Sequence, residues 1–243
     1  MARAFGNEFS SGKGSALRKR ALAVTGAKLD QPAIVSALLA PPSGNPAGDV
    51  VQGWNNSCGA NAVLALQAAV DPTFAAQLAA MTPEERVQYE AAVMQSDPAN
   101  RFALGEYTAR PIPAGWGRDM MARQVSDRFG GEAEVINVED RQHGVHELLR
   151  LLEEGKPVAI GLTNHWLSAT EVRGQSPDAE ILVHDSWTGT TAWVSEADMC
   201  DRAGMNWVAN YFPGTDSPGN LVTLVAPGET SLDASSTFRA NEG

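Results

Sequence analysis

The chain has 243 residues, of which 43% are hydrophobic and 19% are charged, a composition typical of a globular protein with a buried core. No run approaches the roughly 18 apolar residues that a membrane-spanning helix needs, and the net charge of −11 argues against non-specific binding to nucleic acid. The beginning of the chain lacks the continuous apolar segment of a secretory signal peptide. We therefore expect a cytoplasmic protein or one that is exported by a non-Sec route.

The cysteine content argues against a disulfide framework and against a zinc site. The two cysteines, Cys58 and Cys200, allow at most one disulfide, and with four scattered histidines they show no CxxC-type spacing. We expect both thiols to be free, as in a reducing compartment, and we expect neither a metal nor a cofactor. Cys200 follows a helical pattern and is interpreted as a small core residue.

The charge distribution and the patterning divide the chain into three parts. Residues 1–28 hold six basic side chains and one acidic side chain, and residues 1–30 are rich in Gly and Ser, which predicts a mobile basic arm. Residues 31–227 form the predicted folded domain. The small and polar residues 228–243 predict a flexible tail.

Helical patterns dominate the first part of this domain. Apolar spacing predicts a buried helix that runs to about Val70 and has Cys58 in its first turn, after turn and cap formers that include Ser57. Further helices are predicted at Thr73–Met81, from a capping box at Thr82 to about Gln95, and at Gly117–Phe129.

Short alternating runs separated by turn residues predict strands in the second part. These strands are Glu134–Val138, Pro157–Leu162, Trp166–Val172, Glu180–Asp185, Thr190–Val194 and Leu221–Val225, with a helix at Gln142–Glu154. The predicted fold class is α+β, with a helical half of about residues 50–130 packed against an antiparallel sheet half of about residues 131–227.

Cys58 is the candidate nucleophile, because backbone N–H groups and the positive end of the dipole in a first helical turn stabilise a thiolate. Gln52, six residues upstream, is a candidate hydrogen-bond donor to an oxyanion. His165 opens a strand and is the candidate base. Asp185, on the next strand, is placed to accept a hydrogen bond from one imidazole nitrogen and leave the other facing the thiol.

The other three histidines fit this chemistry less well. Strand alternation directs His184 to the face opposite Asp185. His143 and His146 lie at the start of a predicted helix beside charged residues, and they are interpreted as a solvated helix terminus.

The ordered set resembles the papain-like cysteine peptidases. Gln52-Gly53 and Ser57-Cys58 are similar to the family's oxyanion Gln and its nucleophile, and Asp185-Ser186-Trp187 is similar to its Asn-Ser-Trp-Gly segment, with Gly189 one place late. The resemblance implies a papain-like fold with the active site in the cleft between the two halves. It also implies the following roles: Cys58 as nucleophile, His165 as base and acid, Asp185 as orienter, Gln52 with the Cys58 N–H as oxyanion hole, and Trp187 as a shield over the His–Asp bond.

Two departures refine the resemblance. Asp185 stands where the family has Asn, and Gly59 stands where it has an aromatic residue. This combination looks more like compact bacterial branches of the family, such as double-glycine leader peptidases and secreted effector or toxin proteases. The implied activity is a cysteine hydrolase that acts through a thioester on a protein or peptide substrate. Two alternatives stay open: deamidation or transamidation of a Gln side chain by the same triad, and a non-catalytic binding module with Cys58 merely buried.

Overall fold

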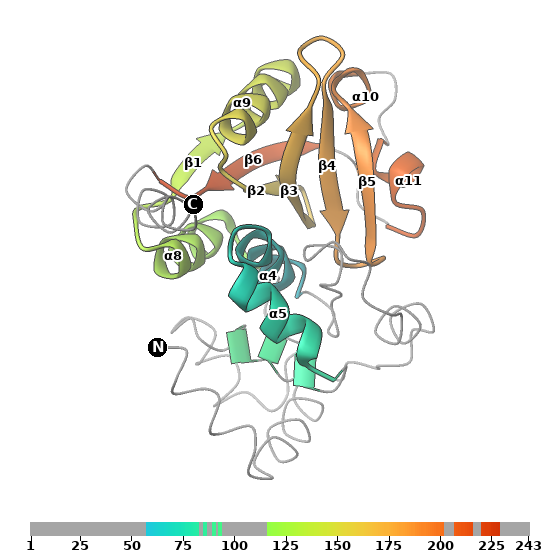
Figure 1. Cartoon of the computed structure of the whole chain (residues 1–243). Helices are drawn as coiled ribbons and strands as arrows, with labels where there is room; N and C mark the ends of the chain where they lie inside the picture. The colour runs from blue at the N-terminus through green and yellow to red at the C-terminus, as the bar shows by residue number, and fades with distance from the viewer. Residues whose placement is uncertain are drawn as a thin grey trace, which may run out of the picture.

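The computed structural model describes residues 57–82, 85–86, 89–90, 92–93, 116–201, 207–215 and 220–228. Within these residues, helices pack against both faces of a six-stranded antiparallel sheet (Figure 1). The α+β class predicted from the sequence is therefore confirmed. The predicted basic arm, nearly all of the predicted tail and Gln52 lie outside the described residues.

The sheet has the strand order β1-β6-β2-β3-β4-β5, and every neighbouring pair is antiparallel. Strands β2 to β5 follow one another along the chain as a meander, and β6 returns to lie between β1 and β2. The strands are β1 (Glu134–Asn137), β2 (Val158–Leu162), β3 (Trp166–Arg173), β4 (Glu180–Asp185), β5 (Thr190–Ser195) and β6 (Leu221–Ala226). All six were predicted, and no boundary differs by more than one residue.

One face of the sheet is covered by the helices α4 (Cys58–Val70) and α8 (Arg118–Phe129), and α5 (Pro72–Ala80) packs against α4. Ten of the thirteen residues of α4 are buried, and most of them are alanine or another small residue, which lets this helix lie close to β2 and β3. The predicted capping box is present, because the Thr82 N–H donates to Glu85 at 2.8 Å and the Glu85 N–H donates to Thr82 at 3.3 Å.

The opposite face is covered by α9 (Arg141–Glu153), together with the short helices α10 (Glu196–Cys200) and α11 (Trp207–Tyr211). Strand alternation explains the two layers: Val158 and Ile160 belong to the core under α9, whereas Ala159 between them belongs to the core under α4. The helix predicted at Gln142–Glu154 is confirmed as α9. The second half contributes a helical layer of its own, and α11 was not predicted.

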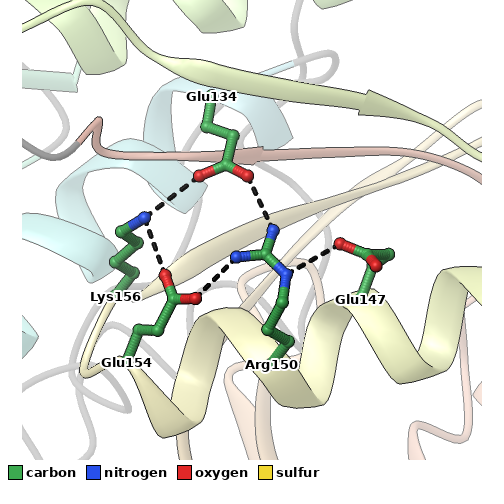
Figure 2. Close-up of polar contacts among 5 residues, drawn as sticks. All are labelled: Glu134, Glu147, Arg150, Glu154 and Lys156. Carbon is green, nitrogen blue, oxygen red and sulfur yellow. Dashed lines mark hydrogen bonds and ion pairs between the residues drawn. The ribbon is translucent and has the colours of Figure 1, made fainter.

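A network of five charged side chains joins α9 to the start of β1 and the turn before β2 (Figure 2). Arg150 contacts three carboxylates, those of Glu134 at 2.7 Å, Glu147 at 2.9 Å and Glu154 at 2.6 Å. Lys156 lies 3.0 Å from Glu134 and 2.8 Å from Glu154. Burial of Lys156 on its own lowers the pKa of its ammonium group, but the two carboxylates outweigh that effect and raise it.

Candidate active site

Cys58 is the first residue of α4, and Ser57 is its N-cap residue. The carbonyl oxygen of Ser57 accepts the backbone N–H of Asn61 at 3.0 Å and its side-chain amide at 3.1 Å, so the start of the helix is held in place. The predicted position of Cys58 in the first turn is confirmed. Because the first N–H groups of an α-helix have no partner within the helix, this end of α4 favours negative charge.

Trp116 fastens the start of α4 to the start of β3. A Cβ atom added to Gly59 would lie 2.8 Å from the Cβ of Trp116, a separation that side chains do not tolerate, so the indole packs directly over the backbone of Gly59. The carbonyl oxygen of the same Trp116 accepts the indole N–H of Trp166 at 2.6 Å. Since Trp166 follows His165, these two contacts hold the start of α4, which carries Cys58, beside the start of β3.

His165 and Asp185 meet because they lie at adjacent ends of two antiparallel strands. His165 directly precedes β3, and Asp185 is the last residue of β4, which pairs with β3. The Nε2 atom of His165 lies 2.8 Å from Oδ1 of Asp185. Both side chains are buried, with exposed fractions of 7% and 0%.

His165 also lies close enough to Cys58 for the thiol to affect its pKa. Burial on its own lowers the pKa of His165, but hydrogen bonds with Asp185 and with Cys58, and the negative charges of both groups, raise it to about 9. The pKa of this imidazole therefore reflects both a thiol on α4 and a carboxylate on β4.

Four donors converge on the carboxylate of Asp185. Oδ1 accepts the His165 Nε2–H and the backbone N–H of Trp187 at 2.9 Å. Oδ2 accepts the hydroxyl of Thr188 at 3.1 Å and the hydroxyl of Thr215. Burial on its own raises the pKa of Asp185, but the hydrogen bond and charge of His165, with Thr215 and the Trp187 N–H, outweigh burial and lower it. This carboxyl group is therefore held in its ionised form.

The two threonines were not predicted as site residues. Thr188 had a recognisable signal, because it lies in the turn that follows Asp185, where the carboxylate also accepts the Trp187 N–H. Thr215 had none, since it reaches Asp185 from 30 residues downstream. The backbone N–H of Trp187 is part of the site, whereas a shielding role for its indole ring stays a prediction.

The remaining predicted side chains lie apart from this group. Nδ1 of His184 is 3.0 Å from the hydroxyl of Thr191 on β5, away from Asp185. His143 and His146 are exposed on α9, as predicted. Both cysteines are free, and the partly buried Cys200 packs against the core under α9.

A groove lies between the start of α8 and strands β1 and β6, with Arg118, Asn137 and Val222 among its lining residues. Neither Cys58 nor His165 lines it. The placement of the active site in a cleft between the two halves therefore stays a prediction. Among the described residues, no three His, Cys, Asp or Glu side chains gather where they would hold a metal ion.

No protein-family model, curated protein or solved structure matches the chain. In the part of the chain that the structure describes, no helix combines the length and apolarity required to cross a membrane.

Proposed function

We propose that this chain is a cysteine hydrolase of the papain-like type, with Cys58 as its nucleophile. The observation that carries the proposal is the 2.8 Å contact of the His165 imidazole with Asp185, together with the effect of Cys58 on the pKa of the same imidazole. The contact of α4 with β3 brings these groups together although more than a hundred residues separate Cys58 from the other two. A thiol, an imidazole and a carboxylate in this order are what covalent acyl transfer requires.

In the proposed reaction, the Cys58 thiolate attacks the carbonyl carbon of an amide, and the carbonyl oxygen becomes an oxyanion. Backbone N–H groups of the first turn of α4 stabilise that oxyanion, with the side-chain amide of Gln52 as a second donor. The His165 imidazolium then donates its proton to the leaving nitrogen, the C–N bond breaks, and a thioester with Cys58 is left. Water attacks the thioester while His165 takes the water proton, which releases the acid and restores the thiolate.

Both departures from the papain-like pattern have a physical explanation. Asp185 in place of Asn adds a negative charge, which is one cause of the raised pKa of His165. Gly59 in place of an aromatic residue leaves room for Trp116, which packs over the helix start from another part of the chain. We also propose, from these two departures, that the chain is closer to compact bacterial proteases than to other papain-like enzymes.

The proposal is tested with a mixed peptide library incubated with the wild-type chain or with Cys58→Ala, followed by mass spectrometry. We expect new peptide termini with the wild type, and a loss on the order of a million-fold in the variant. A gain of about one mass unit on Gln without new termini would favour deamidation by the same triad. Equal products from both proteins would refute a nucleophilic role for Cys58.

A second measurement separates an enzyme from a binding module. Alkylation by iodoacetamide, followed by peptide mapping, compares Cys58 with Cys200 in the same molecule. Burial and the nearby charge of Glu196 raise the pKa of the Cys200 thiol, so Cys200 is an internal reference of low reactivity. We expect Cys58 to react faster at pH 7. A Cys58 no faster than Cys200, with no products from the library, would leave the non-catalytic binding module as the better hypothesis.

A further inference from the structure

The carboxylate oxygen of Asp185 that does not contact the imidazole accepts two hydroxyl hydrogen bonds. Oδ2 accepts one hydroxyl from Thr188, in the turn between β4 and β5, and a second from Thr215, which follows α11. Thr215 is 7% exposed, so its hydroxyl is nearly closed to water. A buried hydroxyl that donates to a fully buried carboxylate is a charge-assisted hydrogen bond, which is stronger than a neutral one.

The segment that carries Thr215 is itself anchored in the core. Trp207 and Phe212 are 3% and 0% exposed, their rings pack edge to face with centroids 6.3 Å apart, and the N–H of Thr215 donates to the carbonyl of Phe212 at 3.2 Å. Gly214 has a φ of +103°, a conformation that a side chain disfavours, and it turns the chain toward Asp185. The α11 segment beside β5 (Figure 1) thus delivers the Thr215 hydroxyl from a fixed position.

The terminal torsion of an Asp side chain is soft and roughly two-fold. Although Oδ1 also accepts the Trp187 N–H, the direction of its hydrogen bond with His165 is defined more sharply when Oδ2 is held as well. Thr188 belongs to the same turn as Asp185 and moves with it, whereas Thr215 comes from a separate element. A fixed carboxylate in turn fixes the plane of the imidazole, and with it the direction of the nitrogen that faces Cys58.

We propose that Thr215 is a positioning residue, whose hydroxyl holds the carboxylate of Asp185 so that the imidazole of His165 is aimed at Cys58. The inference rests on the proposed function and deepens it, because it makes the α11 segment part of the catalytic machinery. The groups that raise the pKa of His165 are Cys58 on α4 and Asp185 on β4. Those that face Asp185 are His165, the Trp187 N–H and the hydroxyls of Thr188 and Thr215.

Two substitutions separate the hydroxyl from the methyl group of this threonine. Thr215→Val keeps the shape and removes the hydroxyl, and Thr215→Ser keeps the hydroxyl and removes the methyl group. A matched control is Thr223→Val, because Thr223 is 5% exposed and its hydroxyl donates to the carbonyl of Ile136 at 3.0 Å, on β1. Circular dichroism and thermal unfolding establish that each full-length variant is folded.

The first readout is the rate at which iodoacetamide alkylates Cys58 at pH 7, with Cys200 as the reference. We expect Thr215→Val to lower the rate about ten-fold, which corresponds to the loss of one hydrogen bond to a charged group. Thr215→Ser and Thr223→Val are expected to stay within about two-fold of the wild type, a difference too small for such a loss. A slow Ser variant with a normal Val variant would mean that packing of the methyl group matters, and would overturn the proposal.

The second readout is the titration of His165, followed through its ring C–H signals by NMR. If Thr215 positions Asp185, the pKa of His165 in Thr215→Val falls below the value of about 9, and Thr215→Ser restores it. A higher or unchanged pKa would mean that the hydroxyl only withdraws charge, and would also overturn the proposal. This readout needs no reactive thiol: an inert wild-type Cys58 would count against the proposed function alone, while the titration still decides the role of Thr215.

Discussion

The clearest quantitative consequence of the site concerns the charge of Asp185. In Asp185→Asn the side chain keeps its shape, and an amide oxygen can still accept from Trp187 or from His165. The negative charge is lost, however, while the burial that lowers the pKa of His165 stays. The pKa of His165 must therefore fall.

The size of the fall follows from the strength of the bond. A hydrogen bond to a charged group contributes about 1.5–3 kcal/mol, and one pKa unit corresponds to about 1.4 kcal/mol. The pKa of His165 should thus drop by about 1 to 2 from its value of about 9 in the wild type. The interaction with Cys58 is unchanged by this substitution and still raises the pKa of His165, which limits the fall.

The same shift predicts how stability depends on pH. A His whose folded-state pKa is raised from 6.5 to about 9 stabilises the fold fully below pH 6.5, and this contribution is lost as the pH rises to about 9. The wild-type contribution is about 3 kcal/mol on this basis. In Asp185→Asn the loss should be smaller and should end at a lower pH.

The assay is an NMR titration of the four histidines, with the His165 signal assigned from its absence in His165→Gln. Urea unfolding at pH 6 and pH 9.5 provides the independent check on stability. A wild-type His165 that titrates near 6.5 would refute the coupled triad altogether. A value near 9 in both proteins would show that the Asp185 charge has no part in the shift.

Two further predictions concern packing and surface charge. Gly59→Ala should lower the free energy of unfolding by about 1–3 kcal/mol, because the added Cβ overlaps the buried Trp116. In the control Gly117→Ala the added Cβ meets no atom within 4 Å, so chemical denaturation should show a cost of at most about 1 kcal/mol. Equal costs for the two variants would contradict the overlap. Arg150→Met should cost about 1 kcal/mol, since solvent screens a guanidinium that is 40% exposed, and 1 M salt should shrink that cost. Arg173→Met, which removes a more exposed pair together with the contact of Arg173 over the Trp193 ring, should cost less than Arg150→Met. A loss for Arg150→Met that salt leaves unchanged would mean that packing decides it.

The strands could be predicted because local patterns decide them. Val158–Leu162 is a fully buried run bounded by turns, and the end of β4 at Asp185 is followed by residues that favour a turn. The pairing of His165 with Asp185 followed from the same signals, since the start of one strand lies beside the end of the next when the two are joined as a hairpin.

Contacts between distant segments could not be predicted in this way. Trp116 over Gly59 and the Thr215 hydroxyl on Asp185 join parts of the chain that share no pattern, and only tertiary packing brings them together. The helix α11 has five residues, too few for a helical period to stand out. Gln52 lies outside the described residues, so its part in an oxyanion hole stays a prediction.

The burial of α4 on nearly every side limits what natural variation this helix can accept. Its alanines are 0–2% exposed where they face the sheet and its neighbours, so a larger side chain at Ala60, Ala62 or Ala65 has no space to enter. In a deep mutational scan that screens for folding, these positions should therefore be intolerant of larger side chains, although they carry no chemistry. Directed evolution of a new specificity would have to leave this helix unchanged and draw its diversity from the loops around it.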